Sequence, residues 1–201
     1  MHEGVVGQFR SGHTTGNLPE SLPNWRVVTD SPETARGVSQ VMGGQPREQD
    51  GKHSLEVLTS SSRVDITLTG PTALRREMKL WRRSRLAHHC DGATFLGPTE
   101  VRGDPCGCPS LMGKKKAEAK AFRGPQPVTT LRFLLTAAPH LGLFYLQSTS
   151  WKLAEDVPEI AEDLRSLEGH ALAELRVELV QFTTIRGSSV AYRRPVIRVL
   201  V

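Results

Sequence analysis

The residues of this chain that are best suited to chemistry lie close together, between positions 88 and 108. Cys90, Cys106 and Cys108 are the only cysteines among 201 residues, and His88 and His89 directly precede the first of them. A structural zinc ion takes four thiolate or imidazole ligands, and three cysteines with one histidine are an established set. The segment therefore predicts a zinc site made of Cys90, Cys106, Cys108 and either His89 or His88.

The same thiols also fit a second interpretation, in which three reduced and unlinked cysteines lie in a polar loop. The Cys-x-Cys spacing of Cys106 and Cys108 is less typical of zinc sites than a two-residue spacing, and a disulfide between them would be strained. In favour of a metal, the segment is irregular and charged and has no apolar core of its own. A bound ion could supply the free energy that folds it.

Enzymatic motifs are missing from the sequence. It contains no G-x-S-x-G, P-loop, dinucleotide fingerprint or H-E-x-x-H. Adjacency does not make Cys90 and His89 a catalytic dyad, because such partners usually meet in space rather than in sequence. We therefore expect a non-enzymatic protein, and a metal-dependent hydrolase is the third interpretation after the two given below.

Positive charge is concentrated around the cysteines. Residues 71–123 hold 12 Lys and Arg against 5 Asp and Glu, a net charge of +7, whereas the whole chain carries +5. Such a segment is typical of a surface that contacts nucleic acid or an acidic partner, and a solvated face that keeps the protein soluble is the alternative. The candidate contact residues are Arg75, Arg76, Lys79, Arg82, Arg83, Arg85, Lys114, Lys115, Lys116, Lys120 and Arg123.

The elements around this segment indicate an α+β fold built on an antiparallel sheet with two to three helices. We expect a flexible arm over residues 1–23 and a single domain over 24–201, with a cysteine-rich basic insertion at 86–127. Strand 24–30 leads into a helix that begins after Ser31, an N-cap residue followed by proline.

Two further elements are expected before the insertion. Alternating apolar residues on either side of "SSS" predict a hairpin over residues 54–70. Leu74, Met78 and Trp81 then follow the spacing of one helical face, which predicts a helix over residues 72–86.

The last eighty residues show regular patterns again. Residues 128–136 and 141–148 predict two strands joined by a turn, and 171–182 with 188–201 predict a closing hairpin. Apolar residues between Leu153 and Leu167 keep helical spacing, with Pro158 inside the pattern, so that we expect either a kink or a helix that begins near residue 156. The predicted order is β-α-β-β-α-insertion-β-β-α-β-β.

Taken in order, these motifs resemble the recombination directionality factor-like proteins of actinobacterial phages and prophages, a family often labelled "hydrolase or metal-binding protein". The matching stretches are "WRVVTDSPETARGVSQVMGG", "KLWRRSRLAHHCDG", "CGCP", "QPVTTLRFLL", "LGLFYLQSTSW" and "RRPVIRVLV". Leu86 and Pro125 stand where the family has further cysteines. A metal in this chain would therefore need His88 or His89 as its fourth ligand.

The resemblance implies a protein that binds a large serine integrase and favours excision over integration. An accessory protein of phage DNA replication or recombination, which binds nucleic acid through the basic segment, is the alternative. The first 22 residues contain no apolar signal segment, and no stretch is long enough to span a bilayer. We therefore expect no membrane contact and a cytoplasmic location in the bacterial host cell.

Overall fold

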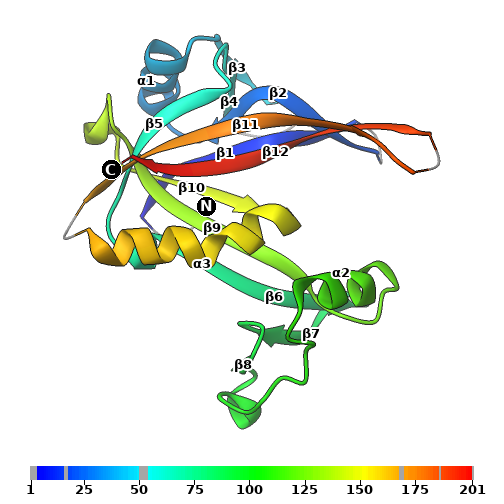
Figure 1. The fold of residues 1–201 in the computed structure, drawn as a ribbon. Coiled ribbons are helices and arrows are strands. Elements are labelled where there is room, and N and C mark those ends of the chain that lie inside the picture. Colours follow the sequence, from blue (N-terminus) through cyan, green and yellow to red (C-terminus); the bar gives the residue numbers. More distant parts are fainter. Residues whose placement is uncertain (1–3, 16–17, 50–53, 168–169, 186, 201) are drawn as a thin grey trace.

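The computed structural model describes residues 4–15, 18–49, 54–167, 170–185 and 187–200. In these ranges the chain forms an α+β fold of three α-helices and a mixed, mostly antiparallel sheet (Figure 1). The strands are β1 (Val5–Thr15), β2 (Leu18–Thr29), β3 (Pro46–Glu48), β4 (Leu55–Leu58), β5 (Arg63–Leu68), β6 (Leu74–Arg82), β7 (Arg85–Cys90), β8 (Phe95–Gly97), β9 (Gln126–Leu135), β10 (Leu143–Ser148), β11 (Ala171–Thr183) and β12 (Ser189–Leu200). The helices are α1 (Pro32–Met42), α2 (Met112–Lys120) and α3 (Trp151–Ser166), with short 3₁₀ helices η1 (Pro71–Ala73), η2 (Thr99–Val101) and η3 (Pro139–Leu141).

The sheet has the strand order β12-β11-β5-β9-β10-β1-β2-β4-β3, and β6, β7 and β8 branch from β9. Along β9, residues 126–131 pair with β6 and residues 134–135 pair with β5. The sheet therefore divides at β9. One branch consists of β5, β11 and β12. Its last strand, β12, also contacts β1 and β2, although it is not next to either of them in the strand order. The other branch leads outward to β7 and β8 (Figure 1).

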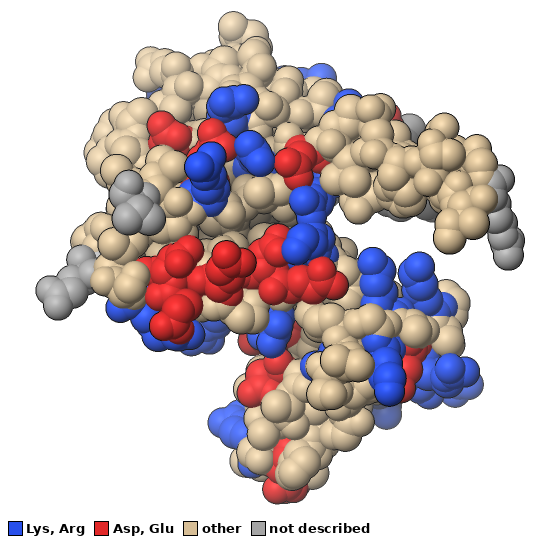
Figure 2. All heavy atoms as spheres, viewed as in Figure 1, with Lys and Arg blue, Asp and Glu red and all other residues tan. Residues whose placement is uncertain are grey.

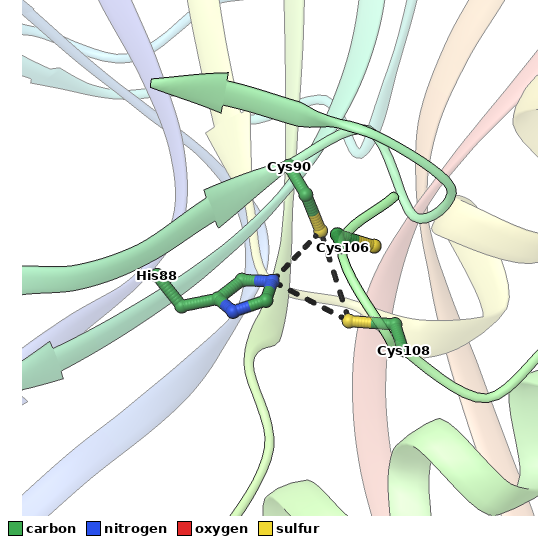
Figure 3. A group of neighbouring side chains, drawn as sticks. All are labelled: His88, Cys90, Cys106 and Cys108. Atoms are coloured by element: carbon green, nitrogen blue, oxygen red, sulfur yellow. Dashed lines mark hydrogen bonds between the residues drawn. The ribbon is translucent and has the colours of Figure 1, made fainter. Parts of the chain in front are cut away.

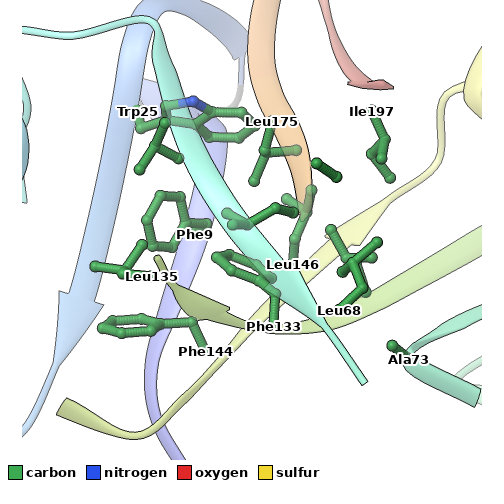
Figure 4. Close-up of a cluster of buried hydrophobic side chains, with 14 of the residues drawn as sticks. Phe9, Trp25, Leu68, Ala73, Phe133, Leu135, Phe144, Leu146, Leu175 and Ile197 are labelled. Carbon is green, nitrogen blue, oxygen red and sulfur yellow. The ribbon is translucent and has the colours of Figure 1, made fainter. Parts of the chain in front are cut away.

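The main core gathers buried side chains from β1, β2, β5, β9, β10 and the β11–β12 hairpin, together with residues of α1 and α3. Figure 4 shows part of this cluster. Phe9 is fully buried at its centre, where its ring makes edge-to-face contacts with Trp25, Phe133 and Phe144 at centroid distances of 5.6, 5.1 and 5.6 Å. Such aromatic pairs add about 0.5–1.5 kcal/mol each to the free energy gained from burial. This core holds β9 in place, and the strands β6, β7 and β8 branch from β9.

Helix α1 begins and ends as its sequence predicted. The Ser31 side chain accepts a hydrogen bond from the Thr34 N–H, and Pro32 occupies the first helical position. Gly43 ends the helix with a φ of 72°. A Cβ on Gly44 would lie 2.1 Å from the carbonyl oxygen of Leu58, so that only glycine fits there.

The helix predicted over residues 72–86 is wrong, because this segment forms the antiparallel strands β6 and β7. Leu74 and Met78 are indeed buried, but a spacing of four residues also places two side chains on one face of a strand. Trp81, the third residue of the expected helical stripe, is 61% exposed. A tight turn at Arg83 and Ser84, with φ of 48° and 64°, joins the two strands.

Two further expectations differ from the structure. Val5–Thr15 and Leu18–Thr29 form β1 and β2 where a flexible arm was expected over residues 1–23, because Val5 and Phe9 are buried in alternation with polar residues. Strands β4 and β5 exist as predicted but do not form a hairpin. β4 pairs with β2 and β3, whereas β5 pairs with β9 and β11.

The elements predicted after the insertion are confirmed. β9 pairs antiparallel with β10, β11 pairs with β12 along twelve residue pairs, and α3 lies between these two hairpins in the chain. α3 begins at Trp151 with Ser150 as its N-cap and continues through Pro158, so the alternative start near residue 156 is wrong. None of the helices in the described ranges has the length and apolar composition of a membrane span.

Candidate metal centre

Strand β7 presents two of the candidate donors on one face. Side chains alternate along a strand, so His88 and Cys90 point to the same side and His89 to the other. β7 pairs with β6 through Leu80↔His88 and Met78↔Cys90, and this pairing continues the main sheet outward. The sheet thus fixes the direction of both donors.

Cys106 and Cys108 reach the same place from the loop that follows β8 and η2. The Cys106 N–H donates to the carbonyl of Ala93, and an isolated bridge pairs Thr94 with Pro105, so that this loop is pinned to the turn after β7. Gly107, with a φ of 70°, turns the backbone between the two cysteines. Both thiols can then face the same centre in spite of their close spacing.

The four donors form a compact cluster (Figure 3). One ligand atom from each of His88, Cys90, Cys106 and Cys108 lies within 4.8 Å of all the others. His88 Nε2 is 3.1 Å from Cys90 Sγ and 3.4 Å from Cys108 Sγ, and the two sulfurs are 3.8 Å apart. Two thiolates on a tetrahedral zinc, with bonds of about 2.3 Å, lie about 3.8 Å apart. The cluster could therefore hold a metal ion.

His89 lies outside this cluster. Its Nε2 is 3.1 Å from Glu77 Oε2, and Lys79 Nζ contacts the same carboxylate oxygen at 2.5 Å. Burial alone would raise the pKa of Glu77, but the hydrogen bonds and positive charges of Lys79 and His89 outweigh it and hold the pKa below its usual value. Of the two histidines considered from the sequence, His88 is thus the one brought to the cysteines.

Burial also sets the protonation of the donors. It raises the pKa values of the Cys90 and Cys108 thiols, and together with the charge of His89 it lowers the pKa of His88. The His88 imidazole is therefore in its neutral, ligating form at neutral pH, whereas the thiols of Cys90 and Cys108 are protonated without a metal. An ion that binds here must displace their protons.

The cluster has a small hydrophobic core of its own. Met78, Cys90 and Cys106 are buried together, and Phe95 and Trp151 pack against them. Asp91 holds the turn after β7, because its carboxylate accepts hydrogen bonds from the N–H groups of Ala93 and Thr94. Trp151 is the first residue of α3, so it joins this small core to the main body of the protein.

The basic residues predicted as one surface are divided among several roles. Lys115 is buried and donates to the carbonyl of Gly92 at 3.0 Å, which ties α2 to the turn after β7. Lys79 pairs with Glu77, and Arg76 donates to the carbonyl of Ala154 in α3. The residues that remain exposed are Arg75, Arg82, Arg83, Arg85, Lys114, Lys116, Lys120 and Arg123. Lysine and arginine side chains accordingly gather over α2 in Figure 2.

Comparison with known families gives a match over nearly the whole chain. The model of the Gp3-like family, described as recombination directionality factor-like, matches residues 6–199. The chain belongs to this family. No solved structure matches the chain. The matched residues include the His88, Cys90, Cys106 and Cys108 cluster and most of the main sheet.

Sequence reasoning missed two residues around the site and gave a third, Lys115, the wrong role. Glu77 holds His89 away from the cluster, Trp151 packs against the thiols, and Lys115 ties α2 to the site instead of facing solvent. If β6 had been recognised as a strand, the alternation would have placed Glu77 on the same face as Lys79 and Trp81. Glu77 could then have been predicted as a partner for a nearby histidine. Neither Trp151 nor Lys115 carries a local signal, because their partners are far away in the sequence.

Proposed function

We propose that this protein is a recombination directionality factor that binds a large serine integrase and favours excision over integration. The family match over residues 6–199 carries this proposal. In physical terms the protein binds the integrase more tightly in the arrangement that leads to excision. Only such a difference in affinity can shift the outcome. The activity belongs in the cytoplasm of the bacterial host, where integrase and DNA meet.

In this proposal the metal is a structural zinc ion held by His88, Cys90, Cys106 and Cys108. Three thiolates and one imidazole fill the four positions of a tetrahedral ion and leave none for a substrate or for an activated water. Zinc then supplies folding free energy to a segment with a small apolar core. A closed site of this kind supports a non-enzymatic role.

The zinc-held segment also offers a surface suited to a protein partner. Trp81 and Leu86 are cross-strand neighbours near the tip of the β6–β7 hairpin, and both are exposed. Arg82 and Arg85 form the next pair along the same hairpin. Tryptophan and arginine are enriched among the residues that dominate binding energy at protein interfaces. We place the integrase contact on this tip.

Recombination by the purified cognate integrase tests the proposal. The protein should stimulate recombination between the two hybrid sites of the integrated phage and inhibit recombination between the phage and bacterial sites. The variant Trp81→Ser/Leu86→Ser should lose both effects and fail to capture integrase in a pull-down. Leu172→Ser on β11, also an exposed leucine, is the matched control and should behave like the unchanged protein.

Zinc content of each variant should be measured alongside, so that loss of the partner is separated from loss of the metal. An unchanged protein that binds no integrase and alters neither reaction would refute the proposed function. If the tip variant stays fully active while retaining its zinc, the contact lies elsewhere on the molecule.

A further inference from the structure

Among the residues that the structure describes, one face of the main sheet carries mostly polar side chains. The core lies against the other face, on which Phe9, Leu131 and Leu146 are buried and to which α3 is attached through Arg76. Strand register places the remaining side chains in rows across the open face. One row runs from β6 to β10 through the cross-strand neighbours Arg75, Thr130 and Gln147. The pair of Arg10 and Arg26 continues this row into β1 and β2, because Arg10 and Gln147 directly follow the paired residues Phe9 and Leu146. We call this row, together with Arg132 beside it, the sheet-face row.

Several cations of the sheet-face row are not neutralised. Within the described ranges, Arg10, Arg75 and Arg132 make no ion pair with a carboxylate; Arg10 donates only to the Gln8 side chain, at 2.9 Å. Arg26, in contrast, contacts Glu56 at 2.5 Å. Burial, followed by the nearby charge of Arg26, lowers the pKa of Arg10. Positive charge is thus crowded around Arg10, and the nearby carboxylate of Glu56 is already shared by Arg26 and Arg47.

The surface is hollowed at both ends of the sheet-face row. A groove of about 500 Å³ lies over β6, β9 and β10. Arg75, Arg132 and Thr130 line it with the hydroxyls of Thr69 and Thr72, and so does the ion pair of Lys79 with Glu77. A second groove, of about 340 Å³, is lined by Arg10 and by Arg26 and Arg47, which both pair with Glu56. Guanidinium and hydroxyl donors that line a groove are suited to phosphate oxygens.

We propose that the sheet-face row binds the sugar–phosphate backbone of a single-stranded nucleic acid, which lies across the strands from β6 to β2. Neighbouring strands are about 4.8 Å apart, so that the row spans about 19 Å. A strand with a phosphate every 3.4 Å or more places about three to five phosphates over this length. Recognition is independent of sequence, because the row offers no exposed aromatic ring for stacking.

Charge on the other side of the sheet is arranged to keep nucleic acid away from it. α3 carries Glu155, Asp156, Glu159, Glu162 and Asp163, and Figure 2 shows an acidic band along this helix. Arg75 and Arg76 are adjacent in β6 and point to opposite faces, and Arg76 is the one that contacts α3. The sheet therefore separates an acidic face from a basic one. This inference does not depend on integrase binding.

An acidic protein segment is the less favoured occupant. Protein interfaces rely on buried aromatic and apolar anchors, and the sheet-face row ends at a single exposed large apolar residue, Leu58, which pairs with Arg26. A DNA duplex is also less favoured, because a stiff helix touches the rims of a groove whereas a single strand can lie inside it.

Fluorescence anisotropy with a labelled 20-nucleotide oligo-dT tests the proposal. The triple variant Arg10→Gln/Arg75→Gln/Arg132→Gln should bind about 10-fold or more weakly, and the slope of log affinity against log salt should fall by about 2, since each lost phosphate contact removes about 0.7 from it. The matched control, Lys114→Gln/Lys120→Gln on α2 with Arg123→Gln just after it, removes the same charge and should change affinity less than about 3-fold.

Circular dichroism and thermal unfolding check that the variants fold, and single substitutions of Arg75 and Arg132 replace the triple variant if it does not. The proposal is overturned if the unchanged protein does not bind oligo-dT, or if the α2 control loses as much affinity as the triple variant. It is equally overturned if a 20-base-pair duplex or poly-glutamate binds as tightly as oligo-dT with the same dependence on the three arginines.

Discussion

At the scale of single residues, the two adjacent histidines show how strand geometry assigns chemistry. His88 and His89 differ by one position and therefore lie on opposite faces of β7. One face holds Cys90 and the cluster, and the other holds Glu77 on β6. Neither residue type nor charge distinguishes the two imidazoles, and only the face of the strand does.

This assignment gives a residue-scale prediction. His88→Ala should lower zinc affinity by more than about 100-fold, because it removes a direct ligand and even the loss of a supporting residue costs about 10–100-fold. His89→Ala removes an identical side chain from the other face and should leave the zinc content close to one ion per chain. Zinc measured by mass spectrometry after dialysis against a chelator compares the two. Equal loss of zinc in both variants would contradict the assignment.

The thiols of the site could be predicted from sequence, but the choice of histidine could not. Cys90, Cys106 and Cys108 were recognised as one cluster because they are the only cysteines and lie in one segment. Which histidine joins the cysteines depends on the face of β7 to which its side chain points. The prediction of a helix over residues 72–86 concealed that this segment contains a strand. Once β7 is known to be a strand, the two-residue spacing of His88 and Cys90 is sufficient to select His88.

At the scale of elements, a hydrogen bond from β6 stabilises α3 at the turn that contains Pro158. Proline has no N–H to donate to the carbonyl of Ala154, four residues earlier. Arg76 Nη1 donates to that carbonyl instead, at 3.2 Å. The arginine was expected on a basic surface, yet it stabilises the junction between β6 and α3.

A double-mutant cycle measures this contact. Arg76→Met should lower the free energy of unfolding by about 1.5–3 kcal/mol, the usual contribution of a charged hydrogen bond. In the background of Pro158→Ala, which restores the N–H donor within the helix, the same substitution should cost clearly less. Urea denaturation of the four proteins gives the coupling energy. Additive effects of the two substitutions would show that Arg76 does not substitute for the missing donor.

Local signals predicted most elements, and long-range pairing caused the errors. α1 and α3 were recognised from caps and from 3.6-residue spacing, and the hairpins β9–β10 and β11–β12 from alternation across a short turn. The β6–β7 hairpin was missed because its turn, Arg83–Ser84, adopts positive φ without glycine or asparagine. β4 and β5 were recognised as strands, but their partners β2 and β11 are set by the packing of the whole sheet.

At the scale of the whole molecule, a large core and a small one have different sources of stability. The main core contains most of the buried aromatic and aliphatic residues, including Phe9, Trp25 and Phe133. The segment from β7 to α2 has only the small core around Met78, Cys90 and Cys106, with Trp151 as its link to α3. If zinc binds as proposed, its ligands add to the stability that the pairing of β6 with β7 and the hydrogen bond of Lys115 to Gly92 give this segment.

Removal of the metal should therefore unfold one part of the molecule and leave the other folded. After chelation, backbone amides of β7, β8 and α2 should exchange with deuterium within seconds to minutes, whereas those of β9, β10 and β1 should keep their protection, because they lie against the main core. Fluorescence of Trp151 should change in parallel, and the variant Trp25→Phe/Trp81→Phe isolates its signal. Readdition of zinc should restore both readouts, and magnesium, a poor partner for thiolates, is the control ion. Uniform loss of protection across all strands, or no change at all, would show that the metal does not support this segment separately from the main core.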